Sequence, residues 1–340
     1  MEGTPLAGLA IISCSGLVNA SFPLPMKYAR EWKWENLWFV FSFWALVLLP
    51  VCAAVSVLPN LWRVYSALSF RDFLPGAVFG LFWGFAQVSF GVAVPMVGMA
   101  MAFAIVAGMC AVLGSLIPMM VLHPQDLLGV GGAALLISSV VLAVGLVLYV
   151  RAARERDRAT AGESINSTGS ASYQKGLLLC LFTGATAPMI NLGFAFSGKI
   201  SAGAVTSGAS ERSATLAIWI IVLGAAAIPN LLYPVYLFSR NKSLIQFSQS
   251  PLKGTLLAAF MGVLWTAGTL GYGWGAATMG RYGVSIGYAV YVVILVLWST
   301  ITGLFTGEWR AAAPPTLRRM RLGLVFIVLA VLIVSAAGLA

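Results

Sequence analysis

The chain has 340 residues, of which 60% are hydrophobic and only 9% are charged, and its formal net charge is +10. Soluble domains average about 45–50% apolar and about 25% charged residues, so this composition excludes a soluble protein and indicates an integral membrane protein. Membrane topology explains the excess of basic residues, so the positive charge does not predict a nucleic-acid partner.

Apolar runs of about 20 residues recur from end to end, and each is long enough to cross a hydrocarbon core of about 30 Å as an α-helix. We therefore predict an all-α membrane protein with ten transmembrane helices and no sizeable soluble domain. The first run lacks basic residues ahead of it, so we expect a retained helix and not a cleaved signal. The predicted spans are 4–25, 36–58, 73–94, 97–122, 127–150, 174–198, 212–238, 253–277, 282–305 and 318–339.

The chain shows a weak internal repeat. Residues 1–150 and 174–340 each hold five predicted spans, and the polar stretch 151–173 between them is expected to be a flexible cytoplasmic linker. An odd number of spans inverts the second half, and inverted five-helix repeats are typical of transporters. One offset pairs Gly80 with Gly262, Trp83 with Trp265, Gln87 with Thr269, Phe90 with Tyr272, Gly91 with Gly273 and Gly98 with Gly280, and a weaker one pairs Gly8 with Gly176 and Gly16 with Gly184.

Basic residues are distributed unevenly between the two sets of loops. Fifteen of the 20 Lys and Arg residues lie on one side of the ten predicted spans and five lie on the other. Because basic residues near helix ends mark the cytoplasmic face, the pattern predicts a multi-pass protein of the cytoplasmic (inner) membrane with both termini in the periplasm. The tryptophan-rich loop 26–38 is interpreted as an interfacial anchor, and the alternative is a cytoplasmic gate.

The polar groups expected inside the bilayer are amides, hydroxyls and indoles. Such groups match the hydroxyls of an uncharged sugar, and aromatic faces cover the C–H side of its ring. Each residue alone has a structural alternative, since a Ser or Thr usually bonds to its own helix and a Trp usually packs. The amides have the stronger case, because an amide in lipid needs partners. The candidate substrate-binding residues are Asn19, Trp83, Gln87, Asn191, Trp265, Thr269, Tyr272 and Tyr288.

None of the ten carboxylates lies near the middle of a predicted span, although proton-coupled carriers usually place an ionisable group there. A proton carrier would then lie at a helix end, and the candidates, in order, are Glu35, Glu211, His123 and Asp126. For His123 the alternative is an exposed loop residue. Nucleophile–base pairs, metal-ligand spacings and phosphate loops are absent from the sequence, so we predict neither an enzyme nor a bound cofactor.

Several short motifs resemble one transporter family over nearly the whole chain. They are Pro25-Met26-Lys27, Trp32-Lys33-Trp34-Glu35-Asn36-Leu37-Trp38, Leu58-Pro59-Asn60, Phe82-Trp83-Gly84, Phe90-Gly91, Gly98-Met99-Ala100-Met101, Tyr272-Gly273-Trp274-Gly275 and Gly307-Glu308-Trp309. In these the chain resembles the L-rhamnose-proton symporter family of the drug/metabolite transporter superfamily. The resemblance implies ten helices in two inverted repeats and import of L-rhamnose or a related deoxy sugar, with protons, by alternating access.

The chain also departs from that family. Its best-known members have an arginine where this chain has Pro95, an asparagine at Gln87, a glutamine near Gly268 and an acidic residue shortly after the eighth span, where this chain reads Arg281-Tyr282-Gly283. These differences bear on which sugar is bound and on whether protons are carried. One alternative is an uncoupled facilitator or an exporter of another small metabolite with the same fold, and a more distant one is a membrane enzyme or scaffold.

Overall fold

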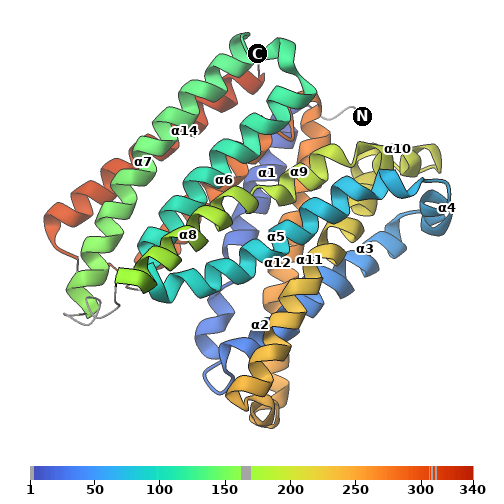
Figure 1. Cartoon of the computed structure of the whole chain (residues 1–340). Helices are drawn as coiled ribbons and strands as arrows, with labels where there is room; N and C mark the ends of the chain where they lie inside the picture. Colours follow the sequence, from blue (N-terminus) through green and yellow to red (C-terminus); the bar gives the residue numbers. More distant parts are fainter. Residues whose placement is uncertain are drawn as a thin grey trace. The chain divides into compact units, whose positions relative to one another are not determined.

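The computed structural model describes residues 4–97, 99–161, 170–305, 307, 309–310 and 312–339, and every regular element in these ranges is a helix (Figure 1). Nine stretches of this described part are long and apolar enough to cross a membrane. The tenth predicted span lies in α14 (Pro314–Leu339), a continuous helix of 26 residues. The predicted all-helical membrane class is therefore confirmed. The nine stretches are Pro5–Tyr28, Trp34–Val57, Phe70–Val94, Ile105–Leu122, Val130–Arg156, Ser172–Thr206, Glu211–Asn241, Pro251–Tyr282 and Ile286–Phe305.

The second span is interrupted by a π turn that the sequence did not predict. It consists of α2 (Trp34–Phe43), the π turn η2 (Trp44–Leu48) and α3 (Leu49–Val57). Pro50 has no N–H to donate to the preceding turn. The Ala45 carbonyl instead accepts a hydrogen bond from Thr266 Oγ1 at 3.0 Å. A hydroxyl from α12 (Pro251–Met279) thereby satisfies a carbonyl that the irregular turn frees.

The sixth span is broken in its polar middle. It runs through α8 (Ser170–Thr186), α9 (Met189–Phe196) and α10 (Gly198–Thr206). The first break falls at Ala187–Pro188, where the proline cannot continue the hydrogen-bond ladder. The first span ends similarly, since α1 (Pro5–Ala20) passes into the 3-10 helix η1 (Leu24–Tyr28) at its two prolines.

The fifth span is longer than expected. α7 (Val130–Ala161) continues eleven residues beyond the predicted end at Val150, into the stretch that we expected to be a linker. Arginine and alanine make up eight of the eleven residues of this extension, and both are strong helix formers. Residues 162–169 of the expected linker lie outside the described residues.

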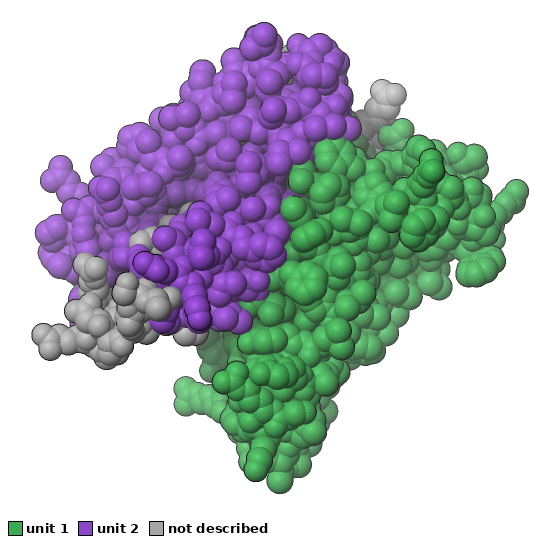
Figure 2. All heavy atoms as spheres, in the orientation of Figure 1, with its two compact units in different colours: residues 1–88, 189–280 green, residues 89–188, 281–340 purple. Residues whose placement is uncertain are grey.

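The chain forms two compact units, and each draws on both halves of the sequence (Figure 2). Unit 1 comprises residues 1–88 and 189–280, and unit 2 comprises residues 89–188 and 281–340. Helix α5 (Phe70–Val97) contributes residues to both. Of the elements not yet given, unit 1 contains α4 (Leu61–Ser66), α11 (Glu211–Asn241) and η5 (Leu244–Ser248). Unit 2 contains α6 (Met99–Leu122), η3 (Pro124–Asp126), η6 (Gly280–Tyr282, which begins at the last residue of unit 1) and α13 (Ile286–Phe305).

Glycines bring the helices of unit 1 into backbone contact. A Cβ on Gly8 would lie 2.7 Å from the Met279 amide nitrogen, so α1 and α12 touch main chain to main chain. A Cβ on Gly80 would lie 2.2 Å from the Val222 carbonyl oxygen, so α5 and α11 do the same. Small residues at helix contacts are the usual means of close packing in membranes, where no hydrophobic force drives helices together.

In unit 2 the corresponding contact joins α7 to α14. A Cβ on Gly145 would lie 2.9 Å from the Gly323 carbonyl oxygen, and a Cβ on Gly323 would lie 2.8 Å from the Gly145 carbonyl oxygen. Gly145 also faces Ile327, and Gly323 faces Tyr149, so the two helices run antiparallel with a reciprocal crossing point.

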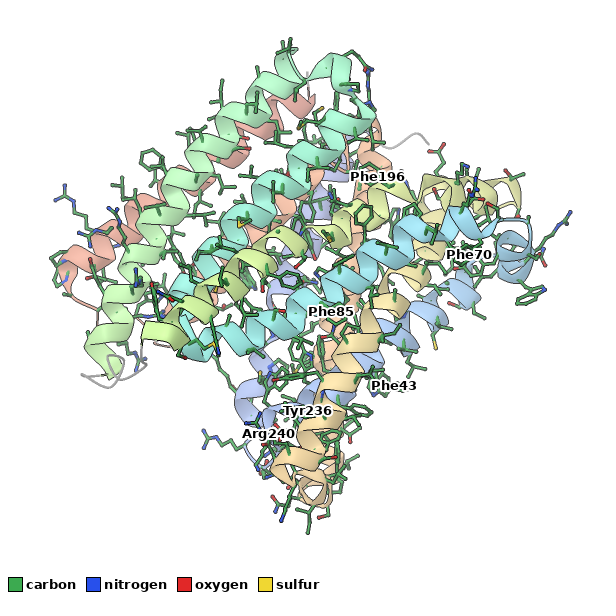
Figure 3. All side chains as sticks on the ribbon, in the orientation of Figure 1. Phe43, Phe70, Phe85, Phe196, Tyr236 and Arg240 are labelled. Carbon is green, nitrogen blue, oxygen red and sulfur yellow. The ribbon has the colours of Figure 1, made fainter. Side chains whose placement is uncertain are left out.

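Large side chains project outward from unit 1 (Figure 3). Phe43, Phe70, Phe85 and Tyr236 all belong to spanning stretches and are between 43% and 77% exposed. In a membrane protein such residues face lipid, while the polar groups described next are buried.

Candidate functional site

One cluster of buried polar groups joins α1 to α12 in unit 1. The Asn19 amide nitrogen Nδ2 donates to the Trp265 carbonyl oxygen at 2.9 Å and to Thr269 Oγ1 at 3.2 Å. All three residues are buried. A Cβ on Gly268 would lie 2.5 Å from Asn19 Cβ, so a glycine at this position is what lets the amide reach across.

A second cluster joins α9 to α12. The Tyr272 hydroxyl donates to Asn191 Oδ1 in a short hydrogen bond, and both residues are almost completely buried. Asn191 lies in the first turn of α9, directly after the break at Ala187–Pro188. The break therefore positions an amide near the start of a half-helix, an arrangement that transporters use at substrate sites.

Aromatic rings flank these amides. The rings of Trp83 and Trp265 stack with centroids 5.6 Å apart and planes 28° apart. Phe41 approaches Trp265 edge-on at 6.5 Å. Trp83 lies on α5 and Trp265 lies on α12. Trp265 therefore contacts Trp83 through its indole and Asn19 through its carbonyl oxygen.

Two further aromatic residues of unit 1 belong to this site, and the sequence analysis did not select them. Phe194 stacks on Trp219 with centroids 4.9 Å apart and meets the Tyr272 ring at 5.9 Å. Trp219 is 1% exposed, and its indole Nε1 is buried without a hydrogen-bond acceptor in the described part of the chain. The signal for them in the sequence is weak, since Phe194 follows Asn191 by three residues and Trp219 lies inside a span.

Two predicted site residues do not join this set. Gln87 is half-buried on α5, and its side chain forms no hydrogen bond to the described residues. Tyr288 lies in unit 2, where its hydroxyl and Cys110 Sγ are 3.1 Å apart and its ring stacks on Tyr291. A Cβ on Gly114 would collide with the Tyr288 ring, so this tyrosine packs tightly against α6. Unit 1 holds the other six predicted residues, whose role in binding stays a prediction.

Among the candidate proton carriers, Glu35 has the most enclosed environment. It is 4% exposed, and it is the only buried carboxylate in the part of the chain that the structure describes. Its Oε1 accepts from Asn241 Nδ2 at 2.9 Å, and no ion pair joins it to the described residues. A carboxylate held by a neutral amide can take up a proton without breaking an ion pair.

The other three candidates are placed differently. In unit 2, Asp126 forms an ion pair with Arg281, and His123 Nε2 lies 3.0 Å from the carbonyl oxygen of the same arginine. In unit 1, Glu211 is the exposed first residue of α11, and Ser210 caps that helix by accepting from the Ser213 amide. A carboxylate in the first turn interacts favourably with the helix dipole. This interaction is enough to explain why Glu211 lies at the start of α11, without a role in proton transport.

The tryptophan-rich loop is tied to the segment that follows α11. Trp32 Nε1 donates to the Gln249 carbonyl oxygen at 2.9 Å, and the Lys33 amide donates to Gln246 Oε1 at 2.8 Å. Lys253 forms an ion pair with Glu31 at 3.1 Å. A backbone hydrogen bond and the Lys253 ammonium hold the pKa of Glu31 below its ordinary value. Trp32 is buried, so this loop does more than anchor the chain at the membrane surface.

Comparison with known proteins agrees with the motifs. Residues 7–340 match the family described as L-rhamnose-proton symport protein (RhaT). The chain belongs to this family. RhaT-family relatives named "L-rhamnose-proton symporter" are 26% identical over 326 residues in Pectobacterium carotovorum (strain PC1), 27% in Shigella dysenteriae serotype 1 and 28% in Escherichia coli (strain 55989 / EAEC), with 93% of each chain covered.

Membership of the RhaT family confirms the resemblance seen in the motifs. It makes the chain a multi-pass transporter and not an enzyme. At 26–28% identity the relatives' names do not transfer a substrate to this chain, so the sugar must be argued from the site.

Proposed function

We propose that this RhaT-family protein imports L-rhamnose or a related 6-deoxy sugar across the cytoplasmic membrane, with protons, by alternating access. The observation that carries the proposal is the pair of neutral, buried clusters of unit 1, in which amides and hydroxyls are hydrogen-bonded to one another. Two of their residues, Trp265 and Tyr272, also contact other aromatic rings. Amides and hydroxyls both donate and accept, so they match sugar hydroxyls without fixing a charge. The aromatic faces suit the apolar side of a pyranose ring and the methyl group of a 6-deoxy sugar.

The polar side chains of the two clusters are hydrogen-bonded to one another. We infer that they exchange these hydrogen bonds for hydrogen bonds to the sugar when it binds. Asn191 and Tyr272 satisfy each other, and Asn19 is satisfied by Thr269 and a carbonyl. The Trp219 N–H is the exception, since it is buried without an acceptor among the described residues. Leaving a buried donor unpaired costs about 1–3 kcal/mol, and a sugar oxygen bound there would remove that cost.

We also propose that residues 1–150 and 174–340 are inverted five-helix repeats that enclose this site. Four contacts support the proposal. The paired residues Trp83 and Trp265 stack on each other, and Gly145 and Gly323 meet reciprocally, as two-fold related residues do at an isologous contact. Gly8 also contacts Met279, and Gly176 contacts Val97. The two contacts are equivalent, because Gly8 pairs with Gly176 at the weaker sequence offset and Val97 pairs with Met279 at the offset that relates Gly80 to Gly262.

The proposed orientation has both termini in the periplasm. The loop 26–38 and the segment after α11 would then lie on the cytoplasmic side, where they are tied together by the Trp32 and Lys33 hydrogen bonds. These hydrogen bonds support a closed cytoplasmic gate, which must break them to release sugar into the cytoplasm. A cytoplasm-specific reporter fused after residue 340 is expected to be inactive.

Uptake by purified protein tests the transport proposal. In proteoliposomes, an inward proton gradient is expected to accumulate labelled L-rhamnose above its external concentration. A protonophore should abolish the accumulation and leave exchange of internal for external sugar intact. Equilibration without accumulation would instead favour the uncoupled facilitator, for which the Arg281-Tyr282-Gly283 sequence at the family's acidic position is the supporting observation.

Replacing Glu35 tests the proposed proton carrier. Glu35→Gln keeps the side-chain oxygen that accepts from Asn241 and removes only the titratable group. We expect proton-driven accumulation to fall at least about tenfold while sugar exchange is retained, because exchange needs no net proton movement. Glu31→Gln is the matched control, since Glu31 lies on the same loop and pairs with Lys253 at the surface. Unchanged accumulation in Glu35→Gln would exclude this carboxylate.

A further inference from the structure

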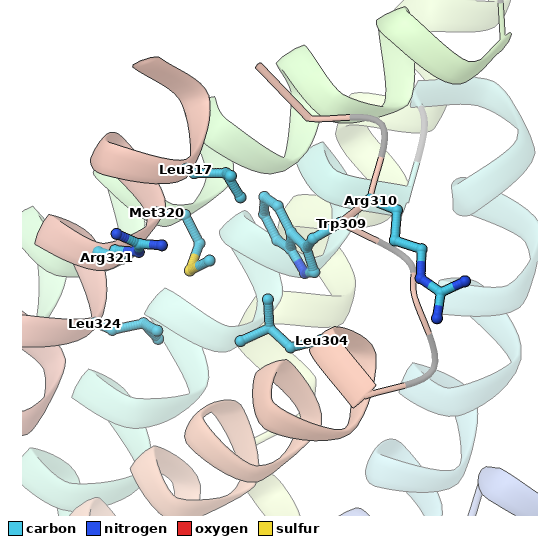
Figure 4. Close-up of a pocket in the computed structure, with 7 residues that line it drawn as sticks. All are labelled: Leu304, Trp309, Arg310, Leu317, Met320, Arg321 and Leu324. Atoms are coloured by element: carbon cyan, nitrogen blue, oxygen red, sulfur yellow. The ribbon is translucent and has the colours of Figure 1, made fainter. Parts of the chain in front are cut away.

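Unit 2 holds a pocket whose lining residues are not part of the buried clusters of unit 1. It has a volume of about 270 Å³ and lies where α13 ends and α14 begins (Figure 4). The spanning stretch Ile286–Phe305 ends beside the pocket, so the pocket lies at the end of a membrane-spanning helix. Phe305 itself is 84% exposed. Its lining residues are Leu304, Trp309, Arg310, Leu317, Met320, Arg321 and Leu324.

Two arginines flank the pocket. Arg310 and Arg321 lie on opposite sides of it in Figure 4, and both are exposed. Neither forms an ion pair with the residues that the structure describes. Their neighbours are already engaged, since Arg319 pairs with Glu155 and Arg156 stacks over the Trp309 ring. Each guanidinium group carries a permanent positive charge and five N–H donors.

The pocket between these charges is apolar. Trp309 and Met320 are buried and form its floor, while Leu304 is 43% exposed at its edge. A soluble anion would gain nothing from such walls. A lipid has both parts, since its phosphate needs donors and its acyl chains need apolar surface, and a tryptophan at a membrane interface favours the same boundary.

We propose that this pocket binds the headgroup of an anionic phospholipid. The headgroup lies at the mouth of the pocket, where the Arg310 and Arg321 guanidinium groups attract its phosphate from opposite sides. The first part of an acyl chain lies along Leu304 and Leu324. Arg310 and Arg321 then have a ligand as well as the topological role of basic residues near helix ends.

Lipid binding to purified full-length protein tests this inference. Native mass spectrometry in neutral detergent should detect phosphatidylglycerol on the protein in preference to phosphatidylcholine. Because each basic residue near an anionic surface contributes about fivefold in affinity, Arg310→Gln/Arg321→Gln should bind phosphatidylglycerol roughly 30-fold more weakly. Each single variant should lose about fivefold.

The control is Arg30→Gln/Arg240→Gln, which removes the same charge from exposed arginines of unit 1 and should bind like the parent protein. Inorganic phosphate and glycerol 3-phosphate at millimolar concentration should not compete. Equal phosphatidylglycerol binding by parent and Arg310→Gln/Arg321→Gln would overturn the site. Full competition by glycerol 3-phosphate would also overturn it, because the pocket would then be a soluble-anion site. The Arg310 and Arg321 single variants decide the question if the double variant does not fold.

Discussion

Asn191→Leu is expected to lower L-rhamnose uptake by roughly 100-fold, because a sugar hydroxyl that the amide would bind is then left buried without its partner, a loss of about 1–3 kcal/mol. The Tyr272 hydroxyl positions this amide by donating to Asn191 Oδ1 in the site without sugar. Tyr272→Phe removes the hydroxyl as well as its need for a partner, and should cost about tenfold. Uptake of labelled sugar at equal amounts of folded protein measures both.

A neighbouring hydroxyl pair separates binding from packing. Thr269 bonds to Asn19 inside the proposed site, whereas Thr266, one turn earlier on α12, bonds to the Ala45 carbonyl beside the π turn. Thr269→Val should lower the affinity for sugar, whereas Thr266→Val should lower the melting temperature at unchanged affinity for sugar. If Asn191→Leu and Thr269→Val transport normally, the cluster is structural and the sugar binds elsewhere.

Gly80→Val is expected to have the largest effect on stability, about 3 kcal/mol or more, because overpacked helix contacts usually cost about 1–3 kcal/mol even when side chains can yield. Here a Cβ would lie 2.2 Å from the Val222 carbonyl oxygen, and backbone cannot rotate away. Helices α5 and α11 would have to separate. The melting temperature of purified protein in detergent measures the loss.

Two other glycines provide the comparison. Gly224 also lies on α11, but a Cβ there would meet no atom within 4 Å. Gly224→Ala should therefore be neutral or stabilising by about 0.5–1 kcal/mol, since alanine is the better helix former. Gly262 is the repeat partner of Gly80, and a Cβ there would meet Trp44 Cβ at 2.8 Å, so Gly262→Ala should be intermediate. Equal melting temperatures for all three variants would contradict the close packing.

The spans could be predicted from the sequence because long apolar runs leave few alternatives to helices. The break of the sixth span was also predictable, since Pro188 lies among polar residues. The π turn was not, because Pro50 alone does not reveal that Thr266 will satisfy the freed carbonyl from another helix. Likewise the extension of α7 to Ala161 was missed, since high polarity hides strong helix propensity.

The site was predicted less completely than the spans. Asn19, Asn191, Thr269 and Tyr272 were selectable because polar groups in a membrane need partners, and the structure supplies a partner for each. Trp219 could not be distinguished from any other buried indole without its neighbours. Tyr288 resembled the site residues in type, and only the tertiary structure assigns it to the other unit.

The central claim is that the neutral cluster of unit 1 binds a deoxy sugar, and thermal unfolding of the purified protein across a panel of monosaccharides tests it most directly. A ligand at 100 times its dissociation constant stabilises the folded state by about 2.7 kcal/mol. The account predicts that L-rhamnose raises the melting temperature, that D-glucose does not, and that Asn191→Leu abolishes the shift. An L-rhamnose shift that persists unchanged in Asn191→Leu, or no shift with any deoxy sugar, would contradict it.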